Sequence, residues 1–217
     1  MHNFLKLSIL ALLLLAALCN AQSNTNSFAF QNGVDFETLA RPVAVEDSSK
    51  IELTEVFWYG CIHCFRLEPM LKEFAAILPA DVNLVKVPAM WHETMELHAK
   101  IYFASQALGI TDQIHDVVFS AMNEQSNTLA NEQAILKLVE DLGQDEAAFQ
   151  RAFNSFGVNS QVTQAKSKTA AYGIRGTPEL IVNGKYRIST SMTGTQQQML
   201  VVAEALIDRE RAMLQGQ

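Results

Sequence analysis

Two cysteines separated by two residues are the strongest sign of chemistry in this chain. Cys61 and Cys64 follow an apolar run, residues 51–59, whose β-branched and aromatic side chains predict a buried strand. The next segment, residues 61–78, has the pattern of a helix. Cys61 is therefore expected at a helix N-terminus, where free backbone N–H groups and the helix dipole favour an anion. That anion would be a thiolate, the reactive form of cysteine, so the spacing predicts a thiol–disulfide redox site.

The first residues of the chain have the pattern of an export signal. Lys6 gives a weakly positive start, residues 7–18 are almost entirely apolar, and small residues precede a cleavage site after Ala21. We therefore expect residues 1–21 to be a signal peptide. A lipoprotein acylated at Cys19 is the alternative interpretation of this segment.

The number of cysteines favours a chemical role for the pair. The sequence has three, and removal of the predicted signal peptide with Cys19 leaves Cys61 and Cys64 alone. A disulfide between them closes a very short loop, so it would stabilise the fold little through chain entropy. Zinc needs about four ligands, and no metal site is predicted, although three histidines are potential additional ligands: His92, His98 and His115.

Composition limits the remaining functions. The chain has a formal net charge of −7 and no basic run, which argues against nucleic-acid binding. After the signal, no apolar segment approaches the roughly 20 residues of a membrane helix. The length suits one domain, or one domain with an insertion.

The order of predicted elements indicates an α/β sheet interrupted by helices. A strand at 82–87 follows the first helix, and this β-α-β unit implies parallel pairing. Asn183-Gly184 between two short β-prone runs predicts a hairpin. We expect further helices at 95–108, 112–122, 127–142, 145–153, 160–172 and 196–214, with Thr94, Thr111, Asn159 and Thr195 as N-caps, and hairpin strands at 179–182 and 185–188.

With these features the chain resembles the DsbA family of periplasmic disulfide oxidoreductases. The Cys-Ile-His-Cys motif after a strand, the block of helices and Gly176-Thr177-Pro178 before the hairpin carry the resemblance. It implies a thioredoxin fold with an inserted helical domain. The thioredoxin-like domain would comprise residues 22–90 and 159–217, and the insertion residues 91–158.

The resemblance also implies roles at the motif. Cys61 would be the nucleophile and Cys64 the buried resolving thiol. His63 lies between them, and a protonated imidazole beside a thiolate stabilises the anion. The commonest dipeptide between the family's cysteines is Pro-His, whereas this chain has Ile62 before His63. Ile62 is also expected to contact substrate.

Three charged residues are expected near the cysteines. Glu55 lies within the apolar strand, where an unpaired carboxylate is costly, so it needs a partner or a proton. The resemblance implies a buried acid near the thiols at this position, which would exchange a proton with Cys64; the alternative is that Glu55 points to solvent or caps a neighbouring group. Glu68 matches another acidic position of the family, and Lys86 is a plausible countercharge. Ordinary solvated ion pairing is an equally good account of Glu68 and Lys86.

Thr177 and Pro178 are expected to line the substrate cleft. In the family the proline is cis and faces the cysteines. The exposed backbone edge of the preceding residue would pair with an extended substrate segment in β fashion. A plain turn proline is the alternative.

The resemblance implies a monomeric enzyme in the periplasm of a Gram-negative bacterium, without a bound cofactor. It would donate its disulfide to unfolded or reduced exported proteins and be reoxidised by a DsbB-type, quinone-linked inner-membrane partner. One alternative is an isomerase or reductase, although residues 22–50 are too short for a dimerisation domain. Another is a secreted chaperone-like binding protein with a structural disulfide.

Overall fold

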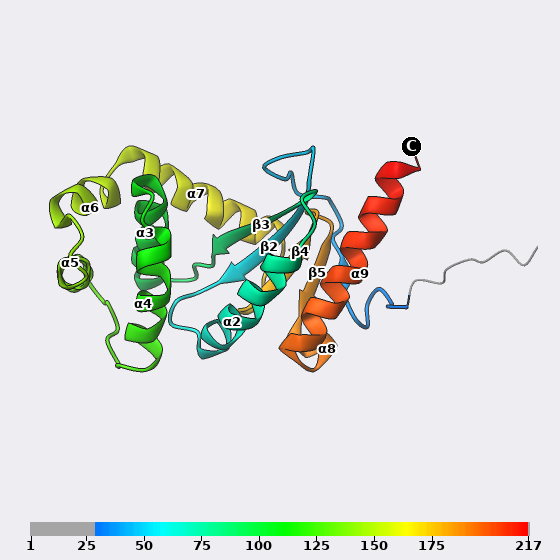
Figure 1. Ribbon diagram of the computed structural model, residues 1–217, viewed down its shortest axis with the longest axis horizontal. Coiled ribbons are helices and arrows are strands. Elements are labelled where there is room, and N and C mark those ends of the chain that lie inside the picture. Colours follow the sequence, from blue (N-terminus) through cyan, green and yellow to red (C-terminus); the bar gives the residue numbers. More distant parts are fainter. Residues whose placement is uncertain (1–28, 217) are drawn as a thin grey trace, which may run out of the picture.

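A computed structural model describes residues 29–216, and their core is a five-stranded mixed sheet (Figure 1). The strand order is β1-β5-β4-β2-β3; β2 and β3 pair in parallel, and the other pairs are antiparallel. The predicted parallel β-α-β unit is thus confirmed. The strands are β1 Glu37–Thr38, β2 Ile51–Phe57, β3 Val82–Pro88, β4 Glu179–Val182 and β5 Tyr186–Ser189. The predicted signal peptide lies outside the described residues.

Helices cover both sides of the sheet, and four of them form a separate group beyond β3, at the left of Figure 1. The helices are α2 Ile62–Ile77, α3 Glu93–Leu108, α4 Thr111–Asn123, α5 Glu132–Asp141, α6 Glu146–Phe153, α7 Phe156–Ala171, α8 Thr190–Thr193 and α9 Gln196–Gln215. Helices α3 to α6 make up that group, and α7 leads back to the sheet.

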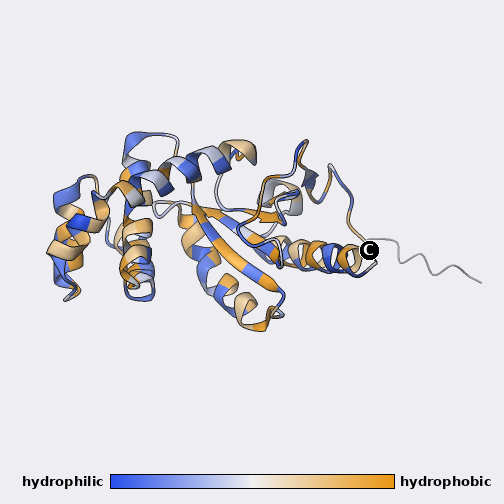
Figure 2. Ribbon diagram, turned by 90° about the horizontal axis from the view of Figure 1, so that it is seen from above, coloured by the Kyte–Doolittle hydropathy of each residue, from blue (hydrophilic) through white to orange (hydrophobic). Residues whose placement is uncertain are grey.

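The alternation of side chains along the strands divides the core into two parts. Leu53 on β2 and Leu180 on β4 pack with α2 and α9 on one face. Val56 and Ile181, of opposite parity, pack into a larger cluster with α3 to α7 on the other face. In Figure 2 the strands of the sheet carry orange stretches interrupted by blue ones. The site-bearing strand β2 is therefore buried along its whole length.

Several predicted helix starts are wrong. The helix expected from 160 with Asn159 as its cap begins at Phe156, because the Ser155 side chain accepts the hydrogen bond from the Val158 N–H. The boundary expected between residues 158 and 159 therefore falls inside α7. The helix expected over 127–142 spans only Glu132–Asp141 and is capped by Asn131.

Two threonines predicted as caps also lie elsewhere. His92 precedes α3 and Ile110 precedes α4, so Thr94 and Thr111 are inside the first turns. The prediction for α9 is confirmed, since Thr195 accepts from the Gln198 N–H at 3.1 Å. Strand β1 and the short helix α8 carry too few residues to produce a periodic signal.

The hairpin turn between β4 and β5 forms as predicted. Asn183 and Gly184 have φ values of 50° and 62°, the left-handed region that an Asn-Gly turn adopts. A Cβ at Gly184 would lie 2.0 Å from the carbonyl oxygen of Val43, so only glycine fits there.

Among the helices of residues 29–216, none combines the length and the apolar character that a membrane-spanning helix needs.

Candidate active site

Cys61 lies at the junction between β2 and the active-site helix. It is the N-cap of α2, with extended backbone, and its side chain is half-buried. Its Sγ lies 3.2 Å from the backbone carbonyl oxygen of Thr177, on the loop before β4. Cys64 is fully buried one turn along α2, and both residues carry free thiols. The predicted placement of the pair on the helix is confirmed.

The two thiols have opposite acid–base character. The pKa of Cys61 is lowered to about 5, chiefly by a hydrogen bond from the Cys64 thiol. The Thr177 side chain and the backbone N–H groups of Cys64 and His63 lower the pKa further, and together these contacts outweigh the effect of partial burial. Burial, chiefly, raises the pKa of Cys64 well above its ordinary value, and the nearby charge of Glu55 adds to this. At neutral pH the site is therefore a thiolate beside a thiol.

The peptide bond between Thr177 and Pro178 is cis, as the family resemblance implies. Glu179 anchors the loop that carries this peptide bond. The carboxylate Oε1 accepts from the backbone N–H groups of Arg175 and Gly176, each at 3.2 Å. Arg187 of β5 donates to Glu179 at 3.2 Å and to the Gly173 carbonyl at 3.0 Å, and it also pairs with Glu37 of β1. These ion pairs and hydrogen bonds hold the Thr177 carbonyl beside Cys61.

Ile62 and His63 lie on the exposed side of the helix start. Ile62 is one of the large apolar side chains that the fold leaves exposed. The backbone carbonyl of His63 accepts from the Gln196 amide at 2.6 Å, which ties α2 to the start of α9. His63 stabilises the Cys61 thiolate through its backbone N–H. A contribution of its imidazole stays a prediction.

The predicted charged residues come together beneath the cysteines. Glu55 is fully buried, and its Oε2 pairs with the ammonium of Lys86. Lys86 also contacts Oε1 of Glu68, on α2, at 2.6 Å. Burial raises the pKa of Glu55 to about 7 despite Lys86. Glu55 thus has both the partner and the proton affinity that its place in an apolar strand requires.

Sequence reasoning missed two aromatic contacts of the site. The Trp58 ring packs so closely over Gly60 that a Cβ there would lie 2.4 Å from it, and its Nε1 donates to His98 at 2.9 Å. The Tyr59 hydroxyl contacts Nδ1 of His115 at 2.8 Å. Both histidines come from the helical insertion, and nothing local in the sequence links them to the Cys-Ile-His-Cys motif.

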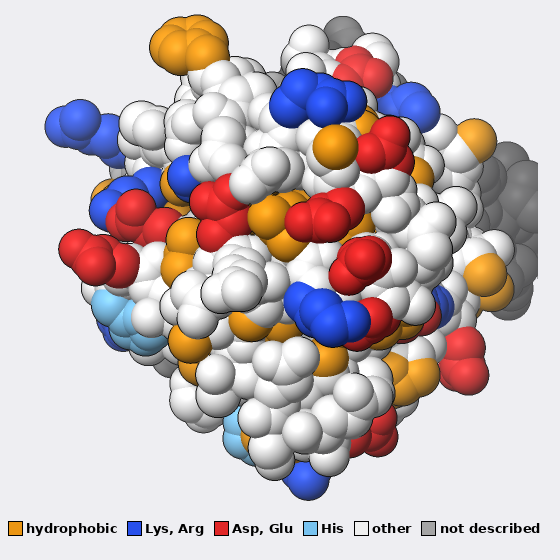
Figure 3. All heavy atoms as spheres, turned by 90° about the vertical axis from the view of Figure 1, so that its left-hand side faces the viewer, with side chains coloured by type: hydrophobic (Ala, Val, Ile, Leu, Met, Phe, Trp, Pro, Cys, Tyr) orange, Lys and Arg blue, Asp and Glu red, His pale blue; other side chains and the backbone are white. Residues whose placement is uncertain are grey.

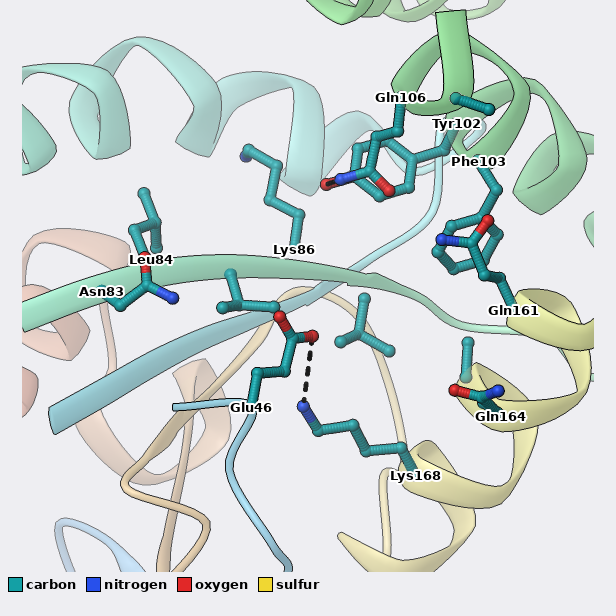
Figure 4. A pocket seen from close by; sticks show the side chains of 14 residues that line it. Glu46, Asn83, Leu84, Lys86, Tyr102, Phe103, Gln106, Gln161, Gln164 and Lys168 are labelled. Carbon is teal, nitrogen blue, oxygen red and sulfur yellow. Dashed lines mark hydrogen bonds and ion pairs between the residues drawn. The ribbon is translucent and has the colours of Figure 1, made fainter. Parts of the chain in front are cut away.

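A polar cavity of about 660 Å³ lies between β3, α3 and α7, away from the cysteines (Figure 4). Its lower part holds the ion pair between Glu46 and Lys168, 3.9 Å apart. Lys86 lines the cavity, but Figure 4 shows its ammonium turned away from that pair, toward α2. Within residues 29–216, no three His, Cys, Asp or Glu side chains gather as a metal site would need.

A thioredoxin-like sheet, a Cys-x-x-Cys pair at a helix start and a cis-proline loop against the first cysteine define a thiol–disulfide oxidoreductase. The profile of the DSBA-like thioredoxin domain family matches residues 71–206. Thiol:disulfide interchange protein DsbA of Pseudomonas aeruginosa is 32% identical over 206 residues, covering 95% of this chain and 97% of that protein. DsbA of Azotobacter vinelandii is 36% identical over 180 residues, 83% and 84% of the two chains.

Solved structures agree with this assignment. The crystal structure of Pseudomonas aeruginosa DsbA superposes with a TM-score of 0.82 at 33% identity, covering 86% of this chain and 97% of that one. NmDsbA1 of Neisseria meningitidis gives a TM-score of 0.76 at 26% identity, covering 85% and 96%. The chain belongs to the DsbA family, and it is a protein-disulfide oxidoreductase with the DsbA-like thioredoxin fold.

Proposed function

We propose that the enzyme works as a disulfide donor, passing a Cys61–Cys64 disulfide to reduced proteins. A substrate thiolate attacks Cys61 Sγ, the bond to Cys64 breaks, and Cys64 leaves with the electron pair and takes a proton. A second substrate thiolate then attacks the substrate sulfur of the mixed disulfide, and Cys61 leaves as a thiolate. The substrate gains a disulfide, and the enzyme is left as the dithiol.

The observation that supports this direction is the low pKa of Cys61, about 5. A stabilised thiolate is a good leaving group, and it makes the reduced enzyme favourable relative to the disulfide. A hydrogen bond from the Cys64 thiol supplies most of this stabilisation, and the Thr177 side chain and the backbone N–H groups of Cys64 and His63 add to it. The same site with an ordinary thiol would hold its disulfide more firmly and act as a reductant.

Around the cysteines we assign three further roles. Glu55 exchanges the proton of Cys64, since its charge already acts on that thiol. Thr177 and Pro178 receive an extended substrate segment, because the Thr177 carbonyl lies 3.2 Å from the attacked sulfur. Ile62 offers an exposed apolar contact beside it.

We further propose that the protein acts in the periplasm of a Gram-negative bacterium as a monomer, after removal of residues 1–21. Its substrates are unfolded or reduced exported proteins, and a DsbB-type, quinone-linked membrane protein reoxidises it. Acidic and basic side chains are mixed on the face shown in Figure 3, so this face has no continuous basic patch that could bind nucleic acid.

The test is the redox equilibrium of the mature protein in graded glutathione buffers, followed by trapping of the free thiols. A donor stays reduced until the buffer is strongly oxidising. A pair that stays oxidised in strongly reducing buffer would instead indicate a reductant or a structural disulfide, and the proposal would be abandoned.

A further inference from the structure

A row of five polar side chains, four of them buried and Lys86 half-buried, runs beneath the cysteines and draws on five segments. In order, the row consists of Tyr59 between β2 and α2, His115 on α4, Glu68 on α2, Lys86 on β3 and Glu55 on β2. The Tyr59 hydroxyl is 2.8 Å from His115 Nδ1, and His115 Nε2 is 3.2 Å from Glu68 Oε1. The row links the helical insertion to the carboxyl group that acts on Cys64.

The contacts of the imidazole define its protonation. Burial lowers the pKa of His115, so the ring is neutral near pH 7. Burial also raises the pKa of Tyr59 well above its usual value, so its hydroxyl keeps its proton and can donate to Nδ1. The ring proton then lies on Nε2, the side of Glu68. Nε2 is not aligned for a hydrogen bond, and the contact with the carboxylate is electrostatic.

Lys86 is shared by two carboxyl groups, and one positive charge does not balance two buried negative charges. One proton is therefore held between Glu55 and Glu68 near neutral pH. Each of the two carboxyl groups has one buried oxygen without a hydrogen bond, Oε1 of Glu55 and Oε2 of Glu68, so their other contacts must distinguish them. Glu55 has Lys86 as its partner. Glu68 has both Lys86 and His115. The better partnered carboxyl group, Glu68, is the one that ionises.

We propose that His115, held in place by Tyr59, is a positioning residue that keeps Glu68 ionised and so places the shared proton on Glu55. This proposal rests on the proposed function, in which Glu55 exchanges its proton with Cys64. The pKa directions agree with the geometry. The pKa of Glu55 is raised, chiefly by burial, and that of Glu68 is lowered, because its contacts with His115 and Lys86 outweigh burial.

Other ionisable groups near His115 are already engaged. Asp116, next to it on α4, pairs with Lys72 at the surface. Tyr102 of α3 packs against the ring at 5.9 Å between centroids, and its hydroxyl accepts from Gln106 at 3.0 Å. Lys86 acts on His115 only electrostatically and lowers its pKa further. Glu68 is therefore the carboxylate that faces the imidazole.

The test is a carbon-13 NMR titration of the glutamate carboxyl groups in the reduced full-length mature protein. Glu55→Gln and Glu68→Gln assign the two resonances. In the native protein Glu55 should titrate near neutral pH and Glu68 only in acid. In His115→Leu the neutral titration should divide between them, with the amplitude at Glu55 falling and that at Glu68 rising. His115→Gln, which restores an N–H donor, should recover part of the native pattern.

Tyr59→Phe removes only the hydroxyl and should move the proton in the same direction by less. Tyr102→Phe, a buried tyrosine outside the row, is the matched control and should leave both titrations unchanged. Near-ultraviolet circular dichroism checks the fold of each variant. The proposal is overturned if folded Tyr59→Phe and His115 variants keep the native titration of both carboxyl groups. The readout does not depend on oxidase activity, so failure of the donor assignment would be seen separately in glutathione buffers.

Discussion

The surroundings of Cys61 and of Cys64 differ more than their shared helical turn suggests. Cys61 sits at the rim, where backbone N–H groups of the helix start and the loop at Thr177 surround a half-buried sulfur. Cys64 sits in the interior, above a carboxyl group whose partners come from other elements. At the rim, a hydrogen bond from the Cys64 thiol, the Thr177 side chain and backbone N–H groups stabilise the Cys61 thiolate, whereas in the interior burial keeps Cys64 in its thiol form.

This difference separates two tasks that one thiol pair must perform. The rim makes Cys61 a good leaving group, and the interior determines where the proton of Cys64 goes. Changes at the rim should alter how strongly the enzyme oxidises. Changes in the interior should alter how its stability and its proton exchange depend on pH. The predictions below test this division, beginning with the largest effect.

Exchanging one sulfur for oxygen should affect the two positions differently. Cys61→Ser should abolish oxidation of a reduced protein substrate, because the attacked sulfur is gone, while near-ultraviolet circular dichroism stays native. Cys64→Ser should also stop turnover but keep a reactive thiolate at Cys61 that forms a mixed disulfide with oxidised glutathione. Mass spectrometry of the adducts distinguishes them. Residual oxidase activity in Cys61→Ser would contradict the assigned nucleophile.

Glu55 should make the reduced protein less stable as pH rises. Its pKa is about 7 in the folded protein against 4.5 ordinarily, so the folded state binds the proton more tightly. The resulting stability is present below about pH 4.5 and is lost as pH rises toward 7, a change of about 3 kcal/mol. Urea unfolding of the reduced protein across this range should show the decline, and Glu55→Gln should remove it.

Glu68→Gln is the matched comparison for that experiment, because the pKa of Glu68 is lowered rather than raised. Its linkage has the opposite sign: the stability from ionised Glu68 is present above the unfolded pKa and is lost as pH falls into the acid range. A decline between pH 4.5 and 7 that survives in Glu55→Gln would show that another group causes it.

The two regions also differ in how far the sequence predicts them. The rim follows from contiguous signals: an apolar strand, cysteines at the next helix start and Thr177-Pro178 before an Asn-Gly hairpin. The interior follows only in part. Glu55 stands out because a carboxylate interrupts an apolar strand, and Lys86 was a plausible partner. Nothing in the sequence linked His115 to this cluster, because its contact with Tyr59 spans 56 residues and depends on how α4 packs.

The helix boundaries show the same limit. Ser155 and Asn159 are both good caps four residues apart, and either choice leaves a regular helix. Which of them begins α7 depends on the turn that follows α6, where the Ser155 N–H bonds to the Ala152 carbonyl. The packing around a helix decides where it begins in such cases, and no local pattern in the sequence reveals that packing.

A smaller effect is expected at the rim from the Thr177 hydroxyl. The Thr177 side chain is one of the groups that lower the pKa of Cys61. Thr177→Val should raise that pKa by about half a unit, since other donors remain. The ultraviolet absorbance of the thiolate against pH measures it. Thr177→Ser keeps a hydroxyl and should stay near the native value; an equal rise in both variants would assign the effect to lost packing instead.

The smallest effect is expected from Ile62→Pro, which introduces the family's commonest dipeptide. Ile62 is the first residue of α2, a position where proline costs no helix hydrogen bond, and Cys61 already has the extended backbone that a residue before proline requires. The N–H donors that stabilise the thiolate belong to His63 and Cys64 and are retained. We therefore expect stability to change by less than about 1 kcal/mol. Urea unfolding, with Ile62→Ala as control, measures this, and the thiolate titration should change little. A shift of more than about one unit in the Cys61 pKa would show that residue 62 tunes the thiolate by a route other than these donors.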